Sequence, residues 1–226
     1  MNVLALQKTD CSLEDEFTNV INWSTSNKLN ININKTKEII FWKTRRGEAK
    51  FNIPTMPGIE RVDHVKLLGV FFNSNLTWNH HLDNILATVS QRFYLMNQLK
   101  HMNLNMAGLN TVFQAMILSR IEYALPVFSG TMRQCDIDRV NSVIRKARRW
   151  GLTNLSIDFD VLASRADKAL FGAALRPGHC LHRLLPEQKA NNKYNLRTTT
   201  ISKYIIPKIK YDKLHDSFIY RCCSQK

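Results

Sequence analysis

The sequence has 226 residues, 44% of them hydrophobic, and its apolar residues recur periodically, which argues against a wholly disordered chain. It has no apolar run near the roughly 18 residues of a membrane-spanning helix and no signal peptide, so we expect an intracellular protein, cytoplasmic or nuclear, with no membrane partner. Lys and Arg number 32 against 18 Asp and Glu, and this net charge of +14 favours RNA or DNA as the partner.

The first third of the chain predicts one helix followed by short strands. Ser12 can cap a helix over residues 12–26, because acidic residues fill its first turn and apolar residues then recur at helical spacing. Residues 28–42 alternate between apolar and polar, which is typical of a half-buried strand or an extended loop. After a turn at residues 57–58, residues 62–72 form a further β segment. We therefore expect a small antiparallel sheet with one helix.

The rest of the chain has mainly helical periodicity. Apolar residues spaced three and four apart predict helices over residues 80–101, 106–124, 134–149 and 158–171. The expected fold class is therefore α+β, with the small sheet followed by a helical part. Residues 179–226 contain ten Lys or Arg against three Asp or Glu, so this short tail carries half of the net charge.

Short motifs spread along nearly the whole chain occur in the order found in one enzyme family. They include Trp23-Ser24, Asn34-Lys35-Thr36-Lys37-Glu38-Ile39, Lys66-Leu67-Leu68-Gly69-Val70, Leu76-Thr77-Trp78, Ser119-Arg120-Ile121-Glu122-Tyr123, His179-Cys180-Leu181-His182 and Tyr194-Asn195-Leu196-Arg197. This ordered set resembles the part of jockey-like, non-long-terminal-repeat retrotransposon reverse transcriptases that follows the catalytic aspartates.

The resemblance implies a domain organisation and a function. Residues 1–77 would be the rear of a polymerase palm, residues 78–176 a helical thumb, and residues 177–226 a basic C-terminal extension. The family carries an Asp-Asp turn just before the region where this chain starts, and the sequence contains no Asp-Asp pair. Polymerases hold two magnesium ions with clustered carboxylates. We therefore expect a truncated RNA-directed DNA polymerase that grips template and primer, without a cofactor, a small-molecule substrate or activity of its own.

The resemblance also assigns roles to two short segments. Lys35 matches a lysine near the phosphates of the incoming nucleotide, where it would act as general acid in the intact enzyme. The alternative is a solvated lysine in a turn. Leu68 and Gly69 match the hairpin that grips the primer end, where a glycine allows close backbone approach. An ordinary strand with a bulge at Gly69 is the other interpretation.

The densest basic cluster falls at the end of the helix expected over residues 134–149. It consists of Arg145, Lys146, Arg148 and Arg149. On a thumb helix these side chains would follow phosphates without reading bases, which suits an enzyme that copies any sequence. A merely solvated face is the alternative. Trp150 beside the cluster either stacks on a base or closes the helix onto the core.

Other polar groups are assigned no metal site. Asp136 and Asp138 lie two apart on a helix, so their side chains point in different directions. The five cysteines are scattered, which predicts reduced thiols. Zinc could use some of the histidines and cysteines, but the spacing of structural zinc sites is absent and packing is the preferred role. The residues concerned are His179, Cys180, His182, Cys222 and Cys223.

Two rival interpretations stay open beside the truncated enzyme. One is a basic helical protein that binds nucleic acid and has no enzymatic activity. The other is a reading frame that forms no stable protein, because half a palm leaves a strand edge and apolar surface uncovered.

Overall fold

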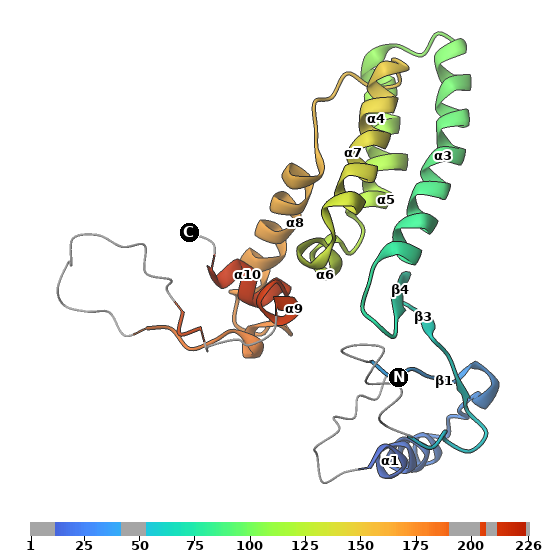
Figure 1. The fold of residues 1–226 in the computed structure, drawn as a ribbon, viewed down its shortest axis with the longest axis vertical. Coiled ribbons are helices and arrows are strands. Elements are labelled where there is room, and N and C mark those ends of the chain that lie inside the picture. The colour runs from blue at the N-terminus through green and yellow to red at the C-terminus, as the bar shows by residue number, and fades with distance from the viewer. Residues whose placement is uncertain (1–11, 42–52, 190–203, 207–211, 225–226) are drawn as a thin grey trace, which may run out of the picture. The chain divides into compact units, whose positions relative to one another are not determined.

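The computed structural model describes residues 12–41, 53–189, 204–206 and 212–224. The chain divides into two compact units, Met1–Leu76 and Thr77–Lys226 (Figure 1). The described part of the first unit contains a helix and short strands, and that of the second is built mainly from helices. The fold class is α+β, as predicted.

Helix α1 (Leu13–Ser26) begins as the sequence predicts. The Ser12 hydroxyl oxygen accepts a hydrogen bond from the Asp15 backbone N–H at 3.1 Å, and the Asp15 carboxylate accepts from the Ser12 backbone N–H at 3.2 Å. This capping box satisfies two backbone donors that a helix start otherwise leaves unpaired.

The strands of the first unit form two separate pairs. Strands β3 (His64–Leu67) and β4 (Val70–Asn73) form an antiparallel hairpin, which corresponds to the expected antiparallel sheet. Strands β1 (Lys37–Glu38) and β2 (Glu60–Arg61) pair in parallel, an arrangement that the sequence pattern did not indicate. Of residues 28–42, only β1 is a strand within the described part; a short 3-10 helix, η1 (Ile33–Lys35), precedes it, and residue 42 lies outside the described residues.

Opposite charges face each other across the parallel pair. Arg61 binds both carboxylate oxygens of Glu38, with Nε–Oε2 and Nη2–Oε1 distances of 3.1 Å each. Lys37 and Glu60 form a second ion pair at the neighbouring position. These contacts fix the register of strands that are too short to be held by backbone hydrogen bonds alone.

The second unit contains long helices joined by short ones. In chain order they are α3 (Asn79–His101), α4 (Met106–Phe113), the π-helix η2 (Gln114–Leu118), α5 (Ser119–Glu122), α6 (Leu125–Phe128), η3 (Ser129–Thr131), α7 (Gln134–Arg149), α8 (Phe159–Ala174), η4 (His182–Leu184), α9 (Asp212–His215) and α10 (Phe218–Ser224). Helices α3, α7 and α8 match the predicted ranges closely.

The helix predicted over residues 106–124 is divided. A π-helical turn, η2, joins α4 to α5, and Ala124 then adopts a left-handed conformation with φ of +56°. The Arg92 guanidinium donates to the Met116 carbonyl inside this turn. Such wide turns free backbone groups that a side chain can bind.

The long helices enclose one hydrophobic core in the second unit. Helix α3 packs on α4, η2, α5 and α7, while α8 packs on α5, α6, α7 and α10. The core includes the fully buried Val89, Met96, Phe113, Ile117, Leu125, Ala147, Leu152 and Leu162. Among the described helices, none has the length and apolar character required to cross a membrane.

Candidate nucleic-acid interface

Helix α7 presents a buried stripe and an exposed basic side. Val140, Ile144 and Ala147 are at most 2% exposed and form the predicted apolar stripe. Arg145, Arg148 and Arg149 lie on exposed positions of the last two turns. Because α3 and α8 both pack on α7, the core fixes which way these arginines face.

Lys146 differs from the three arginines of the predicted cluster in its burial and its partner. Lys146 is partly buried, and its Nζ lies 4.4 Å from the centroid of the Trp150 ring, a cation–π contact. At 3.6 residues per turn, Lys146 lies about 160° from Arg148 but only about 60° from Arg149. The exposed basic groups are therefore the three arginines, while Lys146 packs on Trp150 at the end of the helix.

Trp150 joins the end of α7 to α3. Its ring meets the Phe93 ring edge to face, with centroids 6.0 Å apart, and the residue stays 40% exposed. Its carbonyl accepts a hydrogen bond from Lys100 Nζ at 2.6 Å. This packing corresponds to the second interpretation of Trp150, a residue that closes the helix onto the core.

The carbonyl groups of Ala147, Arg148 and Trp150 at the end of α7 already have donors. Gly151, with φ of +65°, turns the chain so that its N–H donates to the Arg148 carbonyl at 2.9 Å and the Leu152 N–H to the Ala147 carbonyl at 3.0 Å. The Lys100 Nζ donates to the Trp150 carbonyl. The heads of Arg145 and Arg148 are therefore not needed to cap the helix.

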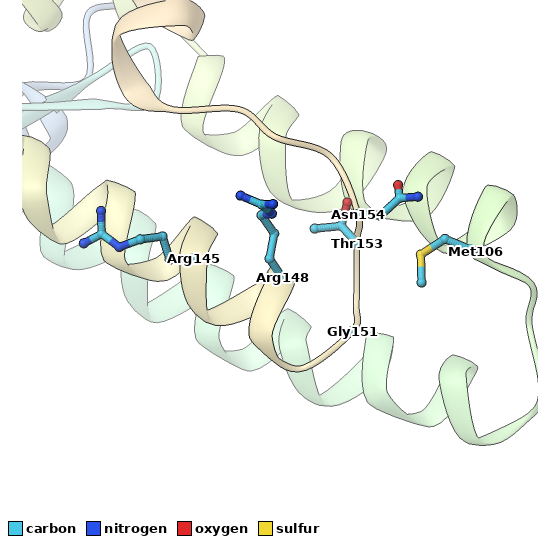
Figure 2. A pocket seen from close by; sticks show the side chains of 6 residues that line it. All are labelled: Met106, Arg145, Arg148, Gly151, Thr153 and Asn154. Atoms are coloured by element: carbon cyan, nitrogen blue, oxygen red, sulfur yellow. The ribbon is translucent and has the colours of Figure 1, made fainter.

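Arg145 and Arg148 line an open pocket beside the end of α7. Its volume is about 470 Å³, and the chain that follows the helix forms part of its wall. Figure 2 shows Arg148 pointing from α7 toward this returning segment, while the Arg145 side chain extends back along α7. The lining residues are Met106, Arg145, Arg148, Gly151, Thr153 and Asn154.

Two stretches of the sequence, one around these arginines and one that covers most of α3 to α5, contain no acidic residue. Residues 84–121 and 139–157 include eight Lys or Arg and no Asp or Glu. Within the described part of the chain, Arg145, Arg148 and Arg149 form no ion pair, whereas Arg139 on the same helix pairs with Asp83 and Asp136. The basic surface therefore has charge available for an external anion.

No family model, curated protein or solved structure matches this chain. Its function must therefore be inferred from its own residues. Of the pocket residues, sequence reasoning identified Arg145 and Arg148 but missed Met106, Thr153 and Asn154. Gly151 directly after the basic helix end indicated a turn there, but no local signal showed what the chain would meet after it.

The predicted site residues of the first unit lie on exposed turns. Lys35 ends η1, and its backbone N–H donates to Asn32 Oδ1 at 3.2 Å. Leu68 and Gly69 connect β3 to β4 with φ of +47° and +86°, so both central residues of this hairpin turn are left-handed. Leu68 is 82% exposed. Leu68 and Gly69 therefore form the turn of the β3–β4 hairpin, and their role in gripping a primer stays a prediction.

The remaining carboxylates belong to separate contacts. Asp136 is buried and accepts from Arg133 Nε at 3.2 Å, with Arg139 3.5 Å away. Asp138, in contrast, accepts from the exposed Gln134 amide. The two side chains are engaged with different partners, in agreement with their expected divergence.

The histidines and cysteines considered for zinc make other contacts. His182 Nδ1 lies 3.1 Å from the Ala174 carbonyl, and His179 Nδ1 accepts from the Leu181 N–H. Burial raises the pKa of the Cys222 thiol to about 12, so it keeps its proton and is a poor metal ligand. Within residues 12–41, 53–189, 204–206 and 212–224, no three potential ligands converge.

Proposed function

We propose that this chain binds the phosphate backbone of RNA or DNA through Arg145, Arg148 and Arg149 of α7. The observation that carries the proposal is that these exposed arginines have no ion-pair partner in the described residues and lie on segments without acidic side chains. A guanidinium matches phosphate geometry with two parallel hydrogen bonds. Contacts of this kind position a strand without reading its sequence.

We also propose that the chain is the rear-palm and thumb part of a non-long-terminal-repeat reverse transcriptase. The ordered motifs support this, and a hairpin followed by long helices fits it. In that enzyme α7 would hold the template–primer duplex and Lys35 would serve the pyrophosphate leaving group. The sequence has no Asp-Asp pair. This favours a second candidate, a nucleic-acid-binding helical protein that does not catalyse.

Binding tests the role of the basic side directly. Fluorescence anisotropy with labelled single-stranded RNA and double-stranded DNA should give a salt-dependent affinity for the wild type. Replacing Arg145, Arg148 and Arg149 by alanine should weaken binding at least about tenfold, and for duplex DNA should reduce the slope of log affinity against log salt by about 3.

A charge-matched variant separates a local interface from bulk charge. Three other exposed basic residues, which form no ion pair within the described residues, are Lys168, Arg176 and Arg183. Replacing them by alanine removes the same number of positive charges. We expect a loss of affinity below about threefold. Equal losses in both triple variants would show that charge alone drives binding. Primer extension that stops on metal chelation would contradict the expected lack of activity.

A further inference from the structure

The polar side chains of the pocket beside α7 offer hydrogen-bond donors. Arg145 and Arg148 have only donors, because a guanidinium carries no acceptor. Asn154 has both kinds of group, but its Oδ1 already accepts from Asn110 Nδ2 at 2.7 Å. Its Nδ2 has no hydrogen-bond partner in the described residues and is the group that can serve a ligand.

The neighbouring contacts fix this orientation of the amides. The Asn154 backbone N–H donates to Asn110 Oδ1 at 3.2 Å, so that atom must be the oxygen. Thr153 Oγ1 donates to the same oxygen at 2.7 Å and accepts from the Leu155 N–H at 3.2 Å. The Thr153 hydroxyl is therefore engaged on both sides, and the pocket presents donors without a competing carboxylate.

The size and the remaining wall of the pocket indicate more than a bare anion. The pocket is open to solvent, and its volume of about 470 Å³ leaves room for a ligand larger than a bare anion. Met106, 38% exposed at the first position of α4, lines it with an apolar thioether that can contact an aromatic ring. The positive end of the α4 dipole also lies at this residue, which favours an anion nearby.

We infer that this pocket holds one nucleotide of a bound single strand. Its phosphate lies against Arg148, Arg145 extends the basic wall along α7, and the base rests between Asn154 Nδ2 and Met106. The inference rests on the proposed function, because it assigns one nucleotide of the bound strand to a defined place. It goes beyond it by requiring Asn154 and Met106, neither of which adds charge to the basic side.

Asn154→Asp tests the pocket while leaving every arginine in place. An aspartate keeps an oxygen for Asn110 but replaces the donor by a second acceptor, which removes a hydrogen bond to the nucleotide and places a negative charge in the pocket that repels it. We expect affinity for a labelled single-stranded oligonucleotide to fall about tenfold. Gln98→Glu is the matched control, since it makes the same change of charge on an exposed position of α3 outside the pocket, and it should stay within about twofold.

A second variant keeps the inference testable if Asn154→Asp does not fold. Met106→Glu puts a carboxylate into the pocket at the start of α4, where a negative charge favours the helix, and should weaken binding to a similar degree. Thermal unfolding of each variant shows whether it is folded. If both folded pocket variants bind like Gln98→Glu while the triple arginine variant is weak, the inference fails and the proposed function stands. If the triple arginine variant also binds normally, both fail.

Adenosine monophosphate distinguishes a pocket that binds a nucleic-acid strand from one that binds a free nucleotide. We expect it, at millimolar concentration, to leave the thermal unfolding of the wild type unchanged. The inference of a bound strand would fail if adenosine monophosphate raised the thermal midpoint of the wild type but not that of Asn154→Asp, while this variant still bound the oligonucleotide normally. The pocket would then be a site for free nucleotides.

Discussion

Arg221 and Asp167 form a two-point ion pair, with 2.9 Å between Nε and Oδ2 and 2.8 Å between Nη2 and Oδ1. The same guanidinium donates to the Asp216 carbonyl at 2.7 Å and to the Ser129 hydroxyl at 3.1 Å. The side chains of Arg221 and Asp167 are 17% and 5% exposed. This one side chain therefore links α10 to α8 and to the turn after α6.

Replacing Asp167 by alanine should destabilise the second unit strongly. The change leaves the largely buried Arg221 charge without its partner, a loss of about 3 kcal/mol or more in the free energy of unfolding. Urea unfolding followed by circular dichroism measures it. The double variant Asp167→Leu, Arg221→Met should recover part of the loss because no unpaired charge remains. A single variant within about 1 kcal/mol of the wild type would contradict this account.

Gly130 should not tolerate a side chain. A Cβ at this position would lie 1.6 Å from Arg221 Nη1 and 2.2 Å from the Asp216 carbonyl oxygen, so both the ion-pair network and the backbone must shift. Gly130→Ala should cost about 2 kcal/mol or more. Gly172→Ala is the control, because nothing lies within 4 Å of the Cβ that it would add in the last turn of α8. That helical site should gain about 0.5–1 kcal/mol. Similar thermal midpoints for the two variants would refute the steric argument.

Local signals predicted the elements whose hydrogen bonds are local. Ser12 and Asp15 are three residues apart, so their capping box is visible in sequence, and the stripe of Val140, Ile144 and Ala147 indicates α7 for the same reason. The π-helical turn was missed because no local residue marks it, and the side chain that donates to its Met116 carbonyl, Arg92, belongs to another helix. The parallel pairing of β1 and β2 was missed because Glu38 and Arg61 are separated by a long stretch of chain.

The candidate site was predicted in part for a related reason. The run of basic residues from Arg145 to Arg149 is a local charge signal, and it pointed to the helix end that borders the pocket. Which of them stay exposed depended on Trp150, whose ring packs against Lys146. The contribution of Asn154 depends on Asn110 in α4, a contact between segments that no sequence pattern joins.

His81 should make stability depend on pH. Its ring is 3% exposed and packs against Phe128, with centroids 4.9 Å apart. Burial, together with the charges of Arg120 and His80, lowers the pKa of His81 from 6.5 to about 4. The unfolded chain therefore binds this proton first as the pH falls. The stabilisation is complete above about pH 6.5 and decreases by about 3 kcal/mol between pH 6.5 and 4.

Urea unfolding at a series of pH values measures this dependence. In His81→Gln the titrating group is absent, so the decrease between pH 6.5 and 4 should be smaller than in the wild type by about that amount. The comparison uses the slope against pH, which is separate from any constant loss caused by the substitution. Parallel curves for the two proteins would exclude His81 as the source.

The two neighbouring ion pairs of the parallel strands should differ in their contribution to the first unit. The Glu38 side chain is 6% exposed and Arg61 also donates to the carbonyls of Ile53 and Pro54, so Glu38→Ala leaves a fixed cation without its carboxylate. We expect a loss of about 3 kcal/mol. Glu60, 67% exposed, pairs with Lys37 in water, and Glu60→Ala should cost less than about 1 kcal/mol. Hydrogen exchange of the backbone amides in β3 and β4 reports the stability of this unit by itself. If both variants exchange alike, burial does not distinguish the pairs, and the register of β1 and β2 is held by something other than Glu38 and Arg61.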